Sequence, residues 1–486
     1  MALVVFLNLV AVVALVYQCM THGFSRTLPL AAFFFVVFPD ECKLQIPGLF
    51  DLTPQRIQII TLLLLTATAK TPRRVVALSG AMVTLAAWWL LSAAVSVVFL
   101  ASLKSVLSQV LDYFVVYYLF ARYISSTEAI KDVLFGIVAG LTVCSVFGVI
   151  EAYAQWTVLS IFPAVAHRFT VSGGLYLDKA RGLRVQSTYA HPILFGSALA
   201  MTIPIALYLA RVSKSTVRKM VIWVGLLLMF ACIFKTASRG PWMALGGACA
   251  ILFAFCWRGV GRNIAMVGAL ALAVMIVRPG VWETIANHYL TTVDGHSYEA
   301  ESYLYRYELY RLAGQELARS PLRAVLGYGP QSFPTLGLVG TINGRTMAFA
   351  SCDSSISALL IETGYVGLAI ATFLFGSAFV RMVRDYLSLS WPDSEICVIF
   401  AVNLFVFLFE MTNVAILGWG QQNFILWVVI ALAMSYPALL RQEQAGGTQN
   451  RTQDTANSKY SWSETHFGRL LLETGSTGAG GAQWLR

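Results

Sequence analysis

Charged residues are scarce in this sequence: Asp, Glu, Lys and Arg make up 12% of its 486 residues, where a soluble globular protein carries about 25%. Apolar residues make up 58%. Runs of about 20 apolar residues recur along almost the whole chain, and each is long enough to cross ~30 Å of hydrocarbon. One span or a cleaved signal peptide cannot account for so many runs. The composition therefore excludes a soluble globular enzyme and predicts an all-α, polytopic membrane protein.

Metal-ligand spacings are also lacking. The eight cysteines are scattered, with no CxxC pair and no Cys/His cluster, so the sequence predicts neither a metal nor a cofactor. Most of them lie inside apolar runs and read as core residues, but Cys42 and Cys352 lie in polar segments and could pair as a disulfide. No internal repeat of fixed period is visible, which disfavours a transporter built from duplicated halves.

The net charge of +10 does not indicate a nucleic-acid partner, because the cations lie in short clusters between apolar runs. Five such clusters alternate with cation-poor loops, as expected for the cytoplasmic side of a membrane protein. The clusters are Lys70, Arg73 and Arg74; Arg122 and Lys131; Arg211, Lys214, Arg218 and Lys219; Arg258 and Arg262; and Arg381 and Arg384. This assignment predicts that residues 156–188 and 278–352 form loops on the opposite, extracytoplasmic face.

The apolar runs predict about twelve or thirteen transmembrane helices. They lie near residues 2–20, 28–38, 57–69, 76–100, 106–123, 130–155, 189–210, 219–236, 241–256, 263–277, 354–380, 395–417 and 421–440. The chain is therefore expected to divide into an N-terminal membrane part (1–277), a long outer loop (278–352), a C-terminal membrane part (353–440) and a tail (441–486). The tail is polar and rich in Gly, Thr and Gln, which predicts a disordered cytoplasmic segment.

Arginine breaks the positive-inside pattern in three separate segments, and a cation on the translocated side needs a reason. Arg184 lies in "RGLRVQSTYAHPILFG" together with Arg181, Arg239 lies in "FKTASRGPWMALGG" one helical turn after Lys235, and Arg306 lies in the long loop. Each alone could be structural, since Ser238 and Pro241 suit a helix start and interfacial arginines snorkel to headgroups. Together they favour a site for phosphate, which guanidinium groups bind bidentately.

The segment around Arg306 is expected to form an amphipathic helix along the membrane surface. Its 3.6-residue stripe consists of Tyr303, Tyr307, Tyr310, Gly314 and Leu317. Tyrosine rings here could contact sugar faces, but tyrosine is also common in the aromatic belts of membrane proteins. Both interpretations stay open from the sequence alone.

Four elements in order over residues 180–370 resemble the bacterial O-antigen ligase and Wzy-type polysaccharide polymerase superfamily. They are Arg184 followed by "AHPILFGSALAMTIPI", then "TASRG", then "YRYELYRLAGQELARSPLRAVLGYGPQSF", and then "ISALLIETGYVGL". The resemblance implies a GT-C-like, metal-independent glycosyltransferase of the bacterial inner membrane, with its active site facing the periplasm. The implied donor is a glycan on undecaprenyl diphosphate, and the partners implied are the bilayer and the chain-length regulator and flippase of the same pathway.

Carried onto matching positions, the resemblance implies that Arg184 and Arg239 hold the diphosphate while Arg306 helps to position it. Positive charge there would stabilise the leaving diphosphate as the bond from the anomeric carbon breaks. Arg181, Lys235 and His191 are further candidates for substrate binding, as are Tyr303, Tyr307 and Tyr310.

The sequence departs from the ligase pattern just before "LLIETG". Ligases of the family commonly carry His-Asn where this chain has Asp353 and Ser354. Asp353 could replace the histidine as general base, or it could be an N-cap of the following helix. Other candidates for the missing role are His191 and His296, whereas Glu299 and Glu301 are better explained as solvated or ion-paired.

The missing histidine favours polymerisation of lipid-linked repeat units into exopolysaccharide or O-antigen. Transfer of glycan to lipid A-core by a ligase is the alternative. A transporter or flippase would need charged residues deep within its spans, and a purely structural subunit would leave the outer arginines unexplained.

Overall fold

The computed structural model describes residues 2–40, 42–44, 51–69, 76–162, 174–178, 181–277 and 298–445, and the side chains of 270–277 and 298–302 are left aside. The labelled helices, in order, are α1 (Ala2–His22), α2 (Phe24–Val37), α3 (Pro54–Leu65), α4 (Ser79–Ala94), α5 (Phe99–Gln109), α6 (Val116–Tyr123), α7 (Thr127–Ala154), α8 (Pro192–Val212), α9 (Thr216–Lys235), α10 (Arg239–Phe255), α11 (Arg262–Val277), α13 (Tyr298–Ala318), α14 (Pro321–Leu326), α15 (Ser355–Ser388) and α16 (Glu395–Asn413). A further helix covers Gln422–Ala445. Between them lie the 3-10 turns η1 (Thr66–Thr68), η3 (Val158–Ile161) and η6 (Phe333–Thr335), and the π-helical turns η2 (Val110–Val115) and η5 (Trp257–Gly261).

The fold is that of a polytopic, mostly helical membrane protein, as the composition predicted. Eight helices in the described part of the chain are long and apolar enough to span a membrane, or nine if the pair Arg239–Phe255 and Trp257–Ala269, bent by 108°, forms one broken span. This count is lower than the twelve or thirteen expected, because several apolar runs form helices of fewer than 18 residues, such as α2 and α4. Strand structure is limited, in the residues described, to two short hairpins, β1 (Tyr176–Asp178) with β2 (Gly182–Arg184) and β3 (Val339–Ile342) with β4 (Arg345–Ala348).

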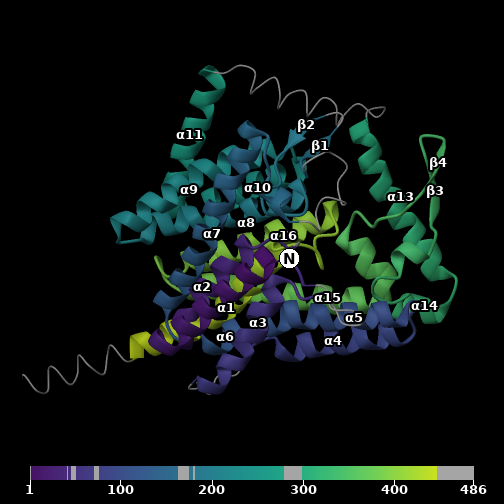
Figure 1. The fold of residues 1–486 in the computed structure, drawn as a ribbon, viewed down its shortest axis with the longest axis horizontal. Coiled ribbons are helices and arrows are strands. Elements are labelled where there is room, and N and C mark those ends of the chain that lie inside the picture. Colours follow the sequence, from purple (N-terminus) through teal and green to yellow (C-terminus); the bar gives the residue numbers. More distant parts are fainter. Residues whose placement is uncertain are drawn as a thin grey trace, which may run out of the picture. The chain divides into compact units, whose positions relative to one another are not determined.

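Helix α8 lies at the centre of the unit Met1–Ser435, where 94% of its membrane window is buried. It packs against α7, α9, α10 and α16, which surround its label in Figure 1. The helix begins at Pro192, whose fixed φ suits a first turn, and ends where Ser213 turns into extended backbone. A central helix that is apolar on all sides must be enclosed by other helices.

Two ion pairs between neighbouring helices lie near the C-terminal end of α8. Arg211 at the end of α8 pairs with Glu395 at the start of α16, and Arg218 near the start of α9 pairs with Asp132 near the start of α7 at 2.7 Å. Val260 of η5 also donates its N–H to Glu395, at 2.8 Å. Three of these four charged residues lie in or next to loops that the cation pattern assigned to the cytoplasm.

Helix α15 breaks at Gly364, where φ is +70°. The carbonyl groups freed by the break are satisfied by the loop after α14: Tyr328 N–H donates to the Ile361 carbonyl at 2.9 Å and Gly329 N–H to the Glu362 carbonyl at 2.8 Å. A Cβ on Gly364 would lie 2.3 Å from the Val325 carbonyl oxygen, so the close approach requires glycine. The "LGYG" and "LLIETG" motifs thus bind each other.

The buried face of α13 differs from the predicted stripe. Leu309, Leu312, Ala313 and Leu317 pack into a cluster with residues of β3 and α15, whereas Tyr303 and Tyr307 are 69% and 65% exposed. The helix is therefore held by aliphatic side chains one position away from the tyrosines. Of the predicted stripe, Leu317 is the member that belongs to this cluster.

Several predictions concern residues outside the described ranges: residues 278–297 of the long loop with His296, the cluster from Lys70 to Arg74, and the tail beyond residue 445. The side chains of Glu299 and Glu301 also belong to this group. Residues Tyr436–Arg486 form a unit distinct from Met1–Ser435. Cys42 and Cys352 are both free thiols, so the disulfide considered between them is absent.

Candidate functional site

The β1–β2 hairpin holds Arg184 in a buried position beside the turn between α9 and α10. Its side chain is 4% exposed. Arg184 Nε donates to the Thr236 carbonyl at 3.0 Å and Nη2 to Ser238 Oγ at 2.8 Å. The guanidinium also lies over the Tyr176 ring, 5.3 Å from its centroid, and 3.4 Å from Asp178 Oδ2. Every side of this cation is therefore fixed by the "TASRG" turn and its own hairpin.

Arg181 joins the same turn from the other end of the hairpin. Its Nη1 donates to the Ala237 carbonyl at 3.3 Å, and its backbone N–H donates to Asp178 Oδ1 at 3.1 Å. Burial, and then the neighbouring Arg181 charge, lower the pKa of Arg184. Two guanidinium groups that destabilise each other in this way form a local environment suited to an anion.

His191 is the N-cap of α8 rather than a free base. Its Nδ1 accepts the Ile193 N–H at 3.1 Å, so the neutral ring carries its proton on Nε2, which lies 3.2 Å from the Tyr176 hydroxyl. Burial, and then Arg184 and Arg181, lower the pKa of His191 to about 3. A ring that is neutral, with its one acceptor nitrogen already used, is poorly suited to the general-base role considered for it.

Arg239 is the first residue of α10, and the glycine after it leaves room for a carboxylate from α16. A Cβ on Gly240 would lie 3.0 Å from Glu410 Oε1. Glu410 is fully buried, accepts a hydrogen bond from Ser197 Oγ at 3.2 Å, and has no hydrogen-bond partner for Oε1 among the described residues. The start of α10 thus combines a guanidinium with a buried acid, and the positive end of a helix favours such a carboxylate.

Arg306 reaches from α13 to the ends of two membrane helices. Its Nε donates to the Asn413 carbonyl at the end of α16, at 2.9 Å, and more weakly to the Asp353 carbonyl before α15, at 3.4 Å. Burial lowers the pKa of Arg306, the charges of Asp353 and Glu410 raise it, and Arg181 lowers it. Arg306 therefore shares one electrostatic environment with Arg181 and with two carboxylates.

Asp353 lies before α15, partly buried, but it is not the helix cap. Ser354 is the N-cap, and its hydroxyl faces the Ser357 N–H at 3.5 Å. The Asp353 carboxylate accepts from Ser351 Oγ at 3.0 Å, and Tyr310 binds Ser354 through its hydroxyl at 2.8 Å. The cap interpretation of Asp353 is therefore wrong, and its carboxylate lies outside the helix beside Arg306.

The predicted residues divide into two groups. Near the starts of α8 and α15 and the end of α16, contacts and shared charge effects link six of them: Arg181, Arg184, His191, Arg306, Tyr310 and Asp353. Arg239, the first residue of α10, directly follows Ser238, which binds Arg184, and we call these seven residues the arginine cluster. The other three lie apart from these contacts. Tyr303 and Tyr307 are exposed on another face of α13, and Lys235 is exposed with its ammonium 5.6 Å from the centre of the Tyr153 ring.

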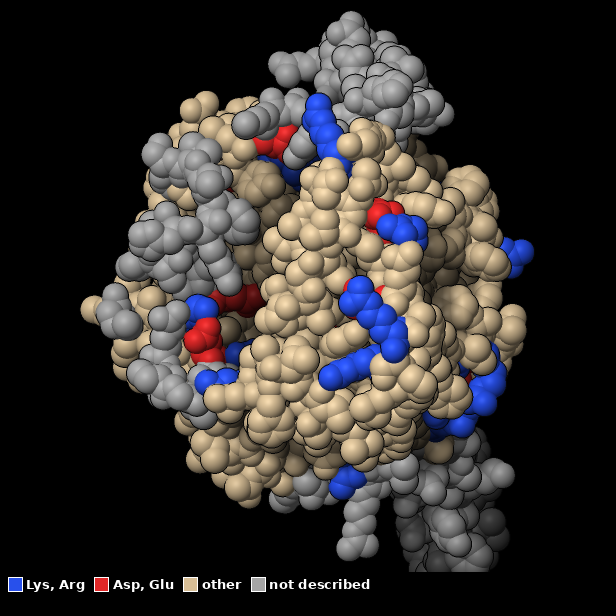
Figure 2. All heavy atoms as spheres, turned by 90° about the vertical axis from the view of Figure 1, so that its right-hand side faces the viewer, with Lys and Arg blue, Asp and Glu red and all other residues tan. Residues whose placement is uncertain are grey.

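Three residues of this site were not foreseen from the sequence, namely Tyr176, Asp178 and Glu410. A signal for Glu410 exists, since it is the acid in the interior of the apolar run 395–417, whose other acid, Glu395, is its first residue. Acids within membrane spans commonly mark functional positions. Figure 2 shows a surface with few charged groups, on which blue and red atoms meet at the edge and in the depth of a hollow. Other Lys and Arg groups lie separately over the rest of this face.

Comparison with known proteins gives one match. Residues 224–372 match the Wzy_C family, described as O-antigen ligase. The matched segment contains Arg239, Arg306 and Asp353, whereas Arg184 and Glu410 lie outside it. None of the curated proteins matches the chain. The family comprises glycan-transferring membrane enzymes that act on lipid-linked glycans, so the resemblance seen in the sequence is confirmed.

Proposed function

We propose that this chain, a membrane protein of the O-antigen ligase family, polymerises diphosphate-linked oligosaccharide repeat units into a bacterial surface polysaccharide. The observation that carries the proposal is the arginine cluster, in which arginines from three separate segments lie near the ends of four membrane helices. A cationic site at the membrane boundary suits a substrate whose diphosphate lies at the lipid surface. The enzyme faces the periplasm in this proposal, in line with the cation-rich loops at the opposite helix ends.

In the proposed reaction, a hydroxyl oxygen of the acceptor sugar attacks the anomeric carbon of the donor. The bond between that carbon and the phosphate oxygen breaks, and the lipid diphosphate leaves with the bonding electrons. Arg184, Arg239 and Arg306 stabilise the negative charge that develops on the diphosphate. No metal is assigned a step in this scheme.

The proton of the attacking hydroxyl passes to a carboxylate. Asp353 fills this role in the proposal, because it is partly accessible and its main chain is bonded to Arg306. A carboxylate oxygen can accept the proton of the attacking hydroxyl. Glu410 of α16 contributes by accepting a hydrogen bond from Ser197 of α8 and by packing against Gly240 at the start of α10, so that it links the three helices.

Transfer of a finished glycan to a lipid A-core acceptor is the second candidate, and the description of the matched family favours it. The presence of Asp353 where ligases commonly carry histidine supports polymerisation instead. A transporter is less well supported. The buried charges Arg56 and Asp112 bind each other through contacts of 2.7 to 3.2 Å, so they do not form the unpaired polar path that transport would use.

The test is deletion of the gene, followed by glycan analysis and complementation with Arg184→Ala, Arg239→Ala and Asp353→Asn. A polymerase predicts the loss of long chains, with single repeat units still attached to lipid. A ligase predicts undelivered polymer that remains on its lipid carrier. Normal glycans in all three variants, at wild-type protein levels, would contradict the proposed site.

A further inference from the structure

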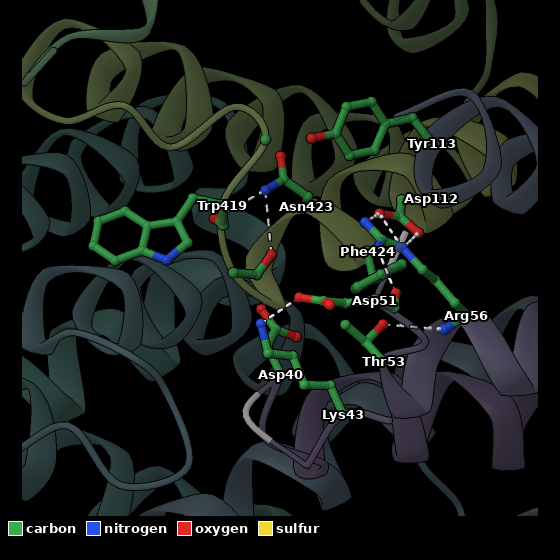
Figure 3. A pocket seen from close by; sticks show the side chains of 12 residues that line it. Asp40, Lys43, Asp51, Thr53, Arg56, Asp112, Tyr113, Trp419, Asn423 and Phe424 are labelled. Carbon is green, nitrogen blue, oxygen red and sulfur yellow. Dashed lines mark hydrogen bonds and ion pairs between the residues drawn. The ribbon is translucent and has the colours of Figure 1, made fainter. Parts of the chain in front are cut away.

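A second polar site lies beside the arginine cluster, on the other side of Trp419. It is a cavity of about 210 Å³, smaller than the ~300 to 1,000 Å³ of pockets that enclose drug-sized ligands, so it fits a single small ring. Figure 3 shows the side chains that line it. They are Asp40, Lys43, Asp51, Thr53, Arg56, Asp112, Tyr113, Trp419, Asn423 and Phe424, together with Gly418 and Gly420.

The charges that line this cavity are largely matched to one another. Arg56 binds Asp112 with both Nε and Nη2, at 3.0 and 2.7 Å, and donates from Nη1 to the Asp51 carbonyl at 2.7 Å. Lys43 pairs with Asp51. With Asp40 included, three carboxylates face two cations. A phosphate would meet a carboxylate excess here, whereas a ligand rich in hydroxyl groups would meet many oxygen acceptors.

One group in the cavity wall lacks a partner. Asn423 is 2% exposed, and its Nδ2 donates to the Ile416, Trp419 and Gly420 carbonyls at 2.8 to 3.2 Å. Its Oδ1 has no hydrogen-bond partner among the described residues. A buried acceptor without a partner is unfavourable, and a ligand hydroxyl would supply the missing donor.

The aromatic residues give the cavity a flat wall. Gly418 and Gly420 have φ of +93° and +86°, and these two left-handed residues hold Trp419 between them in a tight turn. The Trp419 ring lines the cavity and also contacts the His191 ring, whose centroid is 5.9 Å away. His191 in turn contacts Tyr176, the ring beneath Arg184. The cavity is therefore separated from the arginine cluster by a few side chains.

We propose that this cavity is a subsite for one uncharged sugar ring of the acceptor glycan, an inference that rests on the proposed function. Trp419 packs against the ring face, and Asn423 Oδ1 and the carboxylates accept hydrogen bonds from its hydroxyl groups. The donor's first sugar is bonded to the diphosphate and must stay at the arginine cluster. The ring held beyond Trp419 is therefore not the donor's reacting sugar, and we assign it to the acceptor.

The experiment measures transfer by the purified full-length protein in nanodiscs, with lipid-diphosphate repeat unit as the donor and the same oligosaccharide without its lipid diphosphate as the acceptor, so that the two concentrations are varied independently. Trp419→Ala is expected to raise the acceptor KM about ten-fold and change kcat by less than about two-fold, because the ring binds without reacting. Trp419→Phe should restore most of the affinity. Trp156→Ala, which removes a tryptophan that is 42% exposed elsewhere, serves as the matched control with unchanged KM.

A second readout separates this inference from the proposed function. Binding of inorganic diphosphate should weaken in Arg184→Lys and stay unchanged in Trp419→Ala. If the wild-type protein shows no transfer to the repeat-unit acceptor, the proposed function fails. If transfer occurs and depends on the arginines, but the acceptor KM of Trp419→Ala stays within about two-fold of wild type, the subsite is overturned while the function stands.

Discussion

The membrane helices carry arginines at both ends, but the two sets are bonded differently. Where α8 ends, Arg211 and Arg218 pair with the carboxylates Glu395 and Asp132. Where α8 begins, Arg184 and Arg306 donate from Nε to backbone carbonyl groups. Arg184 also has a carboxylate near it, Asp178, but at 3.4 Å this contact is longer than the 2.7 Å between Arg218 and Asp132. A carboxylate cancels the charge of a guanidinium, whereas a carbonyl group orients it and leaves most of the charge in place. The first set therefore suits stability and the second suits the binding of an anion.

The sharpest test of this contrast is the ion pair at the end of α8. Glu395 is 2% exposed, forms an ion pair with Arg211 and accepts a hydrogen bond from the Val260 N–H. Arg211→Ala therefore leaves the buried Glu395 carboxylate without its ion-pair partner. We expect the free energy of unfolding to fall by about 3–5 kcal/mol. Thermal unfolding in detergent measures this change, and transfer per folded molecule should stay at the wild-type level.

A double variant is the control for the stability loss expected in Arg211→Ala. Replacing both Arg211 and Glu395 by leucine removes the two charges together, so most of the lost stability should return. If Arg211→Ala instead abolished transfer at full stability, the division between structural and functional arginines would be wrong.

For Arg306 we expect the opposite result, a loss of transfer with little change in stability. Arg306→Ala should lower transfer by roughly 10²–10³-fold, since it removes a charge aimed at the developing diphosphate. Its side chain is only partly buried, and the aliphatic residues that hold α13 stay in place, so the melting temperature should change little. Arg306→Lys is the control, because it keeps the charge and loses the Nε hydrogen bonds. A large loss of stability in Arg306→Ala would assign this residue to the structural set.

The two carboxylates near Arg306 can be separated by isosteric amides. Asp353→Asn should lower kcat by about 10²-fold, because the proposed base can no longer accept a proton. Glu410→Gln should lower it by about ten-fold, since the side chain keeps its size and its bond to Ser197 but loses its charge. Single-turnover rates across pH distinguish the two roles. If Glu410→Gln loses more activity than Asp353→Asn, Glu410 is the base.

The fold class could be predicted from the sequence because it depends on local signals. Apolar runs set the spans, and alternation of cations sets their direction. Arg184 and Arg239 are brought together by a turn of three residues, Thr236–Ser238, that the "TASRG" segment already indicates. The number of spanning helices was less predictable, because apolar runs such as 28–38 and 76–100 form helices shorter than a full span.

The parts that were missed depend on packing between distant segments. Glu410 enters the site because Gly240 leaves space for it, and no pattern in either segment alone reveals that contact. The cavity beside Trp419 is lined by residues from three distant segments: Asp40, Lys43, Asp51, Thr53 and Arg56; Asp112 and Tyr113; and Gly418, Trp419, Gly420, Asn423 and Phe424. Asp112 lies in a π-helical turn that sequence periodicity does not predict. Tyr303 and Tyr307 are exposed because the leucine face of α13, and not the tyrosine stripe, packs into the buried cluster.

The smallest expected effect concerns the pH dependence that the arginines impose on His191. Its pKa in the folded state is about 3, lowered by burial first and then by Arg184 and Arg181, against ~6.5 when unfolded. The unfolded chain therefore binds more protons between these values, so stability should fall as pH drops below about 6.5. We expect about 1 kcal/mol of extra loss between pH 7 and 5, less than the full linkage because the ring is only partly buried.

His191→Asn should remove this part of the pH dependence while keeping an N-cap for α8. Thermal unfolding of both proteins at pH 7 and pH 5 measures the difference. Inorganic diphosphate sharpens the test: an anion bound beside Arg184 offsets the positive charge that disfavours protonation of His191, so it should shrink the wild-type loss at pH 5 and leave His191→Asn unchanged. An equal response of the two proteins would mean that the anion binds away from the helix end where His191 and Arg184 meet.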